Sequence, residues 1–193
     1  MDYPATLELD APLEVARWRP ILAGILAIPH LIVLYVLQIA ASVAVVVAWF
    51  AIVFTGKLPK GLGDFVAMML RYSTRVTTYA GFLYEPYPPF DFTSSAAEPG
   101  GSPVRVNYQV AYEDRNRLTV LFRLILAIPA AIFFSILGFV VFLALFVAFF
   151  AVIVTGAWPQ GLRDFVVGFL RANNRFNAYA YLLTDEYPPF ATS

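Results

Sequence analysis

Residues Thr155–Phe190 read TGAWPQGLRDFVVGFLRANNRFNAYAYLLTDEYPPF, and residues Thr55–Phe90 read TGKLPKGLGDFVAMMLRYSTRVTTYAGFLYEPYPPF. The two stretches align without a gap at an offset of 100 residues, and 18 of their 36 positions are identical. The same offset places the sequence LAIP at Leu26–Pro29 on LAIP at Leu126–Pro129. Agreement over this length indicates an internal duplication, so the sequence predicts two tandem copies of one unit.

A small, polar segment separates the two copies. Residues Thr93–Pro103, TSSAAEPGGSP, are rich in residues that favour turns and have no apolar periodicity. The predicted organisation is therefore a first membrane repeat at residues 1–92, a Ser/Gly/Pro linker at residues 93–103, and a second membrane repeat at residues 104–193.

The composition favours lipid as the solvent of the long apolar stretches. The chain has 193 residues, of which 60% are hydrophobic and 13% charged, whereas a soluble domain averages about 25% charged residues. No Asp, Glu, Lys or Arg occurs from Pro20 to Gly56 or from Leu124 to Leu162, and about 18 such residues suffice to indicate a membrane span. The N-terminal sequence MDYPATLELDAPLE lacks a basic segment before the first apolar run, so we expect that run to remain in the mature protein.

Each apolar stretch is longer than one membrane crossing requires, and two geometries absorb the excess. The first is a hairpin that enters and leaves on one side, with turns near Gln38–Ser42 and Ser135–Gly138. The second is a kinked single span that begins at Pro29 or Pro129. The hairpin puts all 13 basic side chains on one side, whereas the single span divides them five against eight, so the positive-inside rule favours the hairpin with its basic segments in the cytoplasm.

Two further elements complete each copy. Alternating apolar and polar residues at Val104–Glu113, and more briefly at Thr6–Asp10, predict short strands that pair between the copies. Leu62–Tyr84 and Leu162–Thr184 have the mixed pattern of an amphipathic helix at a membrane interface. The predicted fold class is a mostly α membrane protein of two tandem repeats, each with a short strand, a long apolar helical hairpin or kinked span, and an amphipathic interfacial helix.

Charged residues of the mixed helices are the main site candidates. Asp64, Arg71 and Arg75 share one polar sector, and the second copy repeats them as Asp164, Arg171 and Arg175. In one interpretation the aspartate caps the helix while the arginines reach lipid headgroups. In a second they bind an anionic lipid or ligand, and in a third they form ion pairs that hold the repeats together.

Aromatic residues and the single histidine are secondary candidates. The YPPF sequences end each mixed helix, and their aromatic rings are predicted interface anchors: Tyr87, Phe90, Tyr187 and Phe190. A partner that binds this polyproline-like segment is the alternative. His30 is expected to face the interface or a neighbouring helix, with a role as a haem or chlorophyll ligand as the less favoured interpretation.

The order of these motifs resembles a known family. The pattern RxxxxxxLxxIP, an apolar stretch and then TGxxPxGLxDFVxxxLRxxxRxxxYxxLLxDxYPPF resembles the bacterial membrane family called domain of unknown function 4389, and it occurs twice. Copy one departs from the pattern at Tyr84-Glu85-Pro86. The resemblance implies an integral membrane protein with no assigned activity. Some members carry a lipase label, which this sequence does not support because it has one histidine and no G-x-S-x-G elbow.

The predicted function follows from these exclusions. The sequence predicts a non-enzymatic protein of the bacterial inner membrane that serves as a structural or accessory subunit or shapes the bilayer. The alternatives are a small transporter or anionic-lipid-binding protein that uses the repeated arginines, and a subunit of a pigment or redox complex. Expected partners are the bilayer, other membrane subunits or a second copy of the chain. The zero net charge and the absence of ligand clusters argue against nucleic acid and metal, and no resident cofactor is expected.

Overall fold

The computed structural model describes residues 3–191, and each copy contains a strand followed by three helices. The first copy comprises β1 (Ala5–Leu9), α1 (Arg19–Leu26), α2 (Ile28–Thr55) and α3 (Lys60–Ala80). The second comprises β2 (Val104–Tyr108), α4 (Arg117–Leu121), α5 (Arg123–Thr155) and α6 (Gln160–Ala180). The mostly helical, duplicated architecture predicted from the sequence is confirmed.

The expected hairpins are wrong, because each apolar segment forms one continuous helix. Helix α2 has 28 residues and α5 has 33, with no break at the predicted turns. The polar residues there satisfy their groups without leaving the helix. The hydroxyls of Ser42 and Ser135 donate to carbonyls four residues earlier, and the Gln38 amide donates to the Tyr181 hydroxyl of the second copy.

One part of the alternative geometry, a separate long helix that begins at the proline, is found in one copy. Pro29 lies in the first turn of α2, where its missing N–H costs nothing, and α1 precedes it as a separate helix. Pro129 instead lies inside α5, and the break in the second copy comes earlier, at Phe122 between α4 and α5. The two copies thus enter their long helices differently despite the shared LAIP sequence.

A glycine ends each long helix and turns the chain back. Gly56 and Gly156 have φ of 74° and 76°, the left-handed region in which a side chain is strained. Each glycine amide donates to the carbonyl four residues earlier, at Ile52 and Val152. The reversal packs α3 along α2 and α6 along α5.

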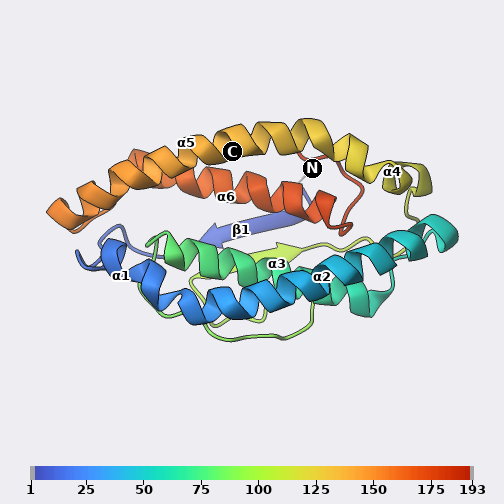
Figure 1. Ribbon diagram of the computed structural model, residues 1–193, viewed down its shortest axis with the longest axis horizontal. Coiled ribbons are helices and arrows are strands. Elements are labelled where there is room, and N and C mark those ends of the chain that lie inside the picture. Colours follow the sequence, from blue (N-terminus) through green and yellow to red (C-terminus); the bar gives the residue numbers. More distant parts are fainter. Residues whose placement is uncertain (1–2, 192–193) are drawn as a thin grey trace.

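The copies run in opposite directions and are related by an approximate two-fold axis (Figure 1). Trp49, near the end of α2, donates from its indole to the carbonyl of Val120 in α4, at the start of the second copy. The segment before α1 likewise pairs with the loop after α5, since the Val15 amide donates to the Gly156 carbonyl. The hairpin geometry would have placed both copies in the same orientation, and this expectation is also wrong.

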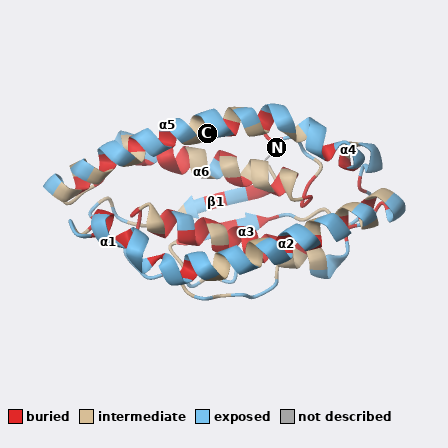
Figure 2. Cartoon of the chain, in the orientation of Figure 1, coloured by how far each residue is buried: buried red, intermediate tan, exposed pale blue. Residues whose placement is uncertain are grey.

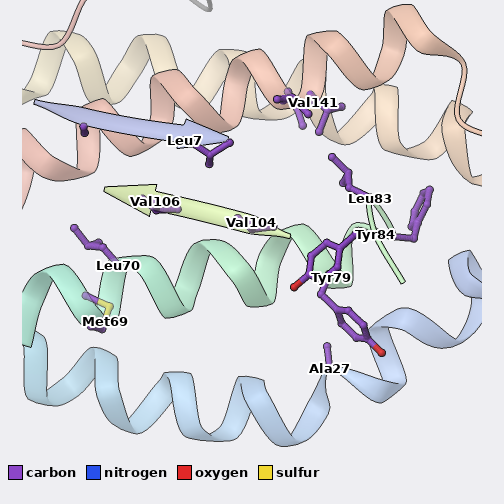
Figure 3. Packing of buried hydrophobic residues seen from close by; sticks show 14 of the residues in the cluster. Leu7, Ala27, Met69, Leu70, Tyr79, Leu83, Tyr84, Val104, Val106 and Val141 are labelled. Carbon is purple, nitrogen blue, oxygen red and sulfur yellow. The ribbon is translucent and has the colours of Figure 1, made fainter. Parts of the chain in front are cut away.

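The strands exchange between the copies. β1 and β2 form an antiparallel pair with Leu7 opposite Val106, which confirms the predicted pairing between copies. β1 packs on α6 and β2 packs on α3, so each strand covers the helix of the other copy. Figure 3 shows Leu7, Val104 and Val106 on the strands between the two mixed helices, in a cluster that also contains Met69 and Leu70. The copies are interlocked rather than placed side by side.

Helices α3 and α6 meet at the centre through equivalent positions. The Thr74 hydroxyl donates to Oδ1 of Asn174 at 2.9 Å, and the Tyr108 hydroxyl donates to the same oxygen at 2.7 Å. Thr74 and Asn174 are 100 residues apart, so the approximate axis passes between them. The centre of the molecule is a buried hydrogen-bonded contact.

The outer faces of α2 and α5 are exposed and apolar. Figure 2 shows exposed residues along both helices, which lie at opposite edges of the view. Large apolar side chains from Ile28 to Phe54 and from Leu124 to Val154 are exposed, and only 17% of the most apolar part of each helix is buried. By length and composition, both helices are long and apolar enough to cross a membrane.

Candidate functional site

The predicted arginines of copy one lie on the face of α3 that carries β2. Arg71 and Arg75 are four residues apart and share this face. Their Nε atoms donate to the carbonyls of Val106 at 3.0 Å and Val104 at 3.3 Å. Only 2% and 1% of these arginines is exposed, so the expectation that they reach lipid headgroups is wrong for this copy.

A linker carboxylate lies between the two arginines. Glu98 pairs with Nη2 of Arg75 through one oxygen and with Nε of Arg71 at 3.5 Å through the other. The second oxygen also accepts the Val106 amide at 2.8 Å, while Asp91 pairs with Arg75 at 3.4 Å. This is the ion-pair interpretation of the arginines, extended from helix to linker and strand. The pKa of Arg71 lies below its usual value because burial lowers it, and the charge of Glu98 offsets only part of this effect.

The equivalent site in copy two is open. Arg171 is exposed, and its Nε donates to the carbonyl of Leu7 on β1 at 3.2 Å. Within residues 3–191 no carboxylate forms an ion pair with Arg171. A hollow of about 200 Å³ adjoins it, lined by Leu9, Arg163, Asp164, Val167 and Arg171. Arg175 is half-buried, and its main-chain carbonyl accepts the Tyr3 hydroxyl.

The two aspartates do not cap their helices. The N-cap residues are Pro59 and Pro159, which make no side-chain cap, so this expectation is wrong. Asp64 lies one turn further into α3 and accepts the Tyr112 hydroxyl at 2.5 Å. Burial, and then this carboxylate, raise the pKa of Tyr112. Asp164 is exposed and has no such tyrosine, because Pro12 stands where the first copy would carry its counterpart.

A third arginine site joins the exit of α6 to the entry of the second copy, and sequence reasoning missed it. Asp185 pairs with Arg115 at 2.8 Å and with Arg123 at 2.5 Å, and it accepts the Asn116 amide. The Arg123 guanidinium lies 3.8 Å from the centre of the Tyr179 ring. Arg19 repeats this stacking on Tyr79 in copy one. The missed signal is the acidic residue before each YPPF, which is Glu85 in one copy and Asp185 in the other.

The Asp185 ion pairs predict a loss of stability in acid. Burial raises the pKa of Asp185, but hydrogen bonds from Arg115 and the Asn116 amide outweigh it and hold the pKa below its usual range. A depressed carboxylate pKa contributes stability above the unfolded value of about 3.9, and this contribution is lost as pH falls through the folded value. Unfolding midpoints of the wild type and Asp185→Asn should differ by a constant amount above about pH 5 and converge below about pH 3. A constant difference throughout would contradict this role, and Asp164→Asn is the exposed control.

His30 is enclosed by aromatic rings. Its Nδ1 lies 2.7 Å from the Tyr72 hydroxyl, and its ring stacks on Phe90 with 4.1 Å between centres and contacts Tyr87. Its Nε2 is buried and has no hydrogen-bond partner among residues 3–191. A cofactor bound at this imidazole would have to displace these rings.

The predicted aromatic anchors are partly exposed. Tyr87 and Phe90 lie beside the start of α2 and Phe190 contacts Phe133 of α5, while Tyr187 packs on Tyr179. About half of each anchor ring remains exposed. Their role at a lipid interface stays a prediction that this placement permits.

The fold and its arginine sites define a class of duplicated, mostly helical proteins in which each copy supplies a strand and an exposed apolar helix. Within that class, the chain belongs to the family described as Domain of unknown function (DUF4389), which it matches over residues 18–91 and 117–192. The two matched regions confirm the tandem copies predicted from the sequence and leave out both strands. No curated protein and no solved structure matches the chain significantly.

Proposed function

We propose that the protein is a non-enzymatic accessory subunit of a bacterial inner membrane that inserts both long helices into one leaflet and shapes the bilayer. The observation that carries this proposal is the exposed outer face of α2 and of α5, which is predominantly apolar and carries no charged side chain. In water, exposed apolar area of this extent costs about 25 cal/mol per Å², and lipid removes that cost.

The position of the sheet favours insertion along the membrane over crossing it. The strands lie beside the middle of α3 and α6, and their outer face carries Thr6, Glu8, Arg105 and Asn107. Glu8 and Arg105 form an exposed ion pair at 3.1 Å. If α2 and α5 crossed the bilayer, this face would lie at membrane depth, where a charged side chain costs about 2.5–3.5 kcal/mol or more.

The helix lengths support the same orientation. At about 1.5 Å per residue, α2 and α5 are roughly 42 Å and 50 Å long, against a hydrocarbon core of about 30 Å. Helices that lie along the membrane avoid this mismatch. Their bulk then enters one leaflet, with the sheet facing water, and this asymmetry is the physical basis for bending the bilayer.

The two alternative functions have less support. In copy one the arginines available to an anionic lipid are already paired with Glu98 and Asp91. The approximate axis, where a transporter of two repeats would hold its substrate, is filled by the contact of Thr74, Asn174 and Tyr108. A pigment or redox role would have to use His30, which aromatic rings enclose.

Labelling of the two ends of α2 tests the orientation. The sequence has no cysteine, so Arg17→Cys and Lys57→Cys each create a single thiol at an exposed position beside opposite ends of the helix. In native membranes an impermeant maleimide should label both from the same side, and Val43→Cys on the apolar face should be protected. Labelling from opposite sides would show that α2 crosses the bilayer.

Reconstitution tests membrane association and shaping separately. The chain should float with liposomes in a density gradient and should reduce vesicle diameter or produce tubules as the protein-to-lipid ratio rises. Flotation without any change in vesicle shape would remove the shaping role and keep the membrane assignment. A chain that stays monomeric in buffer without detergent would overturn both.

A further inference from the structure

We propose that the outer edge of β1, together with Arg171, binds an extended acidic peptide segment of a partner protein. The occupant is identified by a contact inside this chain, where linker residues Ser95–Glu98 occupy the equivalent edge of β2. The inference does not depend on the membrane orientation, because both strand edges and both arginines are defined within the fold.

The linker shows how such a segment is held in copy one. Nη2 of Arg71 donates to the carbonyls of Ser95 at 3.1 Å and Ala96 at 2.8 Å. The Tyr108 amide donates to the Ala96 carbonyl, and the Val106 amide donates to the Glu98 carboxylate. An arginine on the helix and free amides on the strand edge thus hold one extended acidic segment.

Copy two presents the same donors. Arg71 bonds the carbonyl of Val106 and Arg171 bonds the carbonyl of Leu7, and these two strand residues are directly opposite each other. The Val106 amide points away from β1, toward Glu98. In an antiparallel pair, two opposite residues that do not bond each other both direct their main-chain N–H and C=O groups away from the partner strand. Leu7 and Val106 form such a pair, so the Leu7 amide points away from β2.

Space and charge beside this edge fit the carboxylate of a partner. Arg171 is exposed, and within the described part of the chain no segment covers it as Ser95–Glu98 covers Arg71. The adjoining hollow of about 200 Å³ contains two arginines, Arg163 and Arg171, and one carboxylate, Asp164, so its net charge favours an anion. Strand addition supplies main-chain hydrogen bonds, and the positive charge beside the edge favours an acidic side chain at the position of Glu98, which in copy one lies 3.5 Å from Nε of Arg71 and pairs more closely with Arg75.

A peptide with the linker's own sequence is the probe. A fluorescent peptide TSSAAEPGGSP should bind the full-length chain saturably, as followed by anisotropy. Arg171→Gln should weaken binding about tenfold or more, because a charge-assisted hydrogen bond is lost, and glutamine in place of the peptide's glutamate should have a similar effect. Arg105→Gln, on the outer face of the sheet, is the matched control and should leave the affinity unchanged.

Three results would overturn the proposal. One is that the wild-type chain does not bind the peptide, although the unchanged unfolding temperature of Arg171→Gln shows that the fold around the edge is intact. The second is binding that survives Arg171→Gln and is lost in Arg71→Gln, because the peptide then displaces the linker in copy one. The third is binding of anionic-lipid vesicles or inorganic phosphate through Arg171 without any peptide binding, which would define a simple anion site.

Discussion

Replacing Glu98 with Gln should lower the free energy of unfolding by about 3 kcal/mol, a large effect for a residue in an apparently featureless linker. Only 8% of the Glu98 side chain is exposed, and it neutralises Arg71 and Arg75, which are almost fully buried. Removing one partner of a buried ion pair leaves the other charge without compensation. Thermal or denaturant unfolding in detergent, followed by circular dichroism, measures the difference.

Glu113→Gln is the matched control for this prediction. Glu113 pairs with Lys57 at 3.3 Å, but both side chains are largely exposed, so the same chemical change should cost less than about 1 kcal/mol. Equal effects of the two substitutions would show that burial of the Glu98 cluster contributes nothing. An effect confined to Glu98→Gln would identify the linker as part of the folded core.

Neither copy should fold without the other. A chain divided between Gly100 and Gly101, where both residues have positive φ and open space around them, keeps Glu98 with copy one and β2 with copy two. Fragment 1–100 then lacks the strand that covers α3, and fragment 101–193 lacks the strand that covers α6. Each fragment alone exposes an apolar helix face, and the arginines on that face lose the strand carbonyls to which they donate, which a small domain cannot tolerate.

Co-expression of the two fragments measures this dependence. Each fragment alone should be protease-sensitive and lack a cooperative unfolding transition, whereas the pair should copurify and recover one. The uncut chain and a chain divided in the exposed α2–α3 turn, which severs contacts within one copy, serve as comparisons. A fragment 1–100 that folds stably alone would contradict the structural role of strand exchange.

The duplication, the reversal at Thr-Gly and the strand pairing were predictable because each has a local signal. Eighteen identities at one offset identify the repeat, a glycine after an apolar run marks a helix end, and alternation over Val104–Glu113 marks a strand. The path of the long helices was not predictable from such signals. Gln38 and Ser42 resemble a turn in sequence, but a serine that bonds its own helix and an amide that reaches the other copy leave the helix intact.

The periodicity of the sequence could not predict which groups surround the arginines. Spacing by four places Arg71 and Arg75 on one face of a helix, yet it does not say whether lipid, water or a strand covers that face. The strand that covers this face comes from the other copy. The carboxylate that neutralises the arginines on it is Glu98, the single charged residue of the linker. The same spacing at Arg171 and Arg175 leads to a different environment. Internal symmetry in the sequence therefore does not ensure equal surroundings.

The exchanged strands have a consequence for the origin of the chain. The turn after each long helix pairs with the entry segment of the other copy, since the Leu58 amide donates to the Tyr112 carbonyl and the Trp158 amide to the Leu13 carbonyl. A polypeptide with one copy would leave these groups and one face of its mixed helix uncovered. We therefore expect a single-copy ancestor to have existed as a symmetric, strand-swapped homodimer, which gene fusion later joined into one polypeptide.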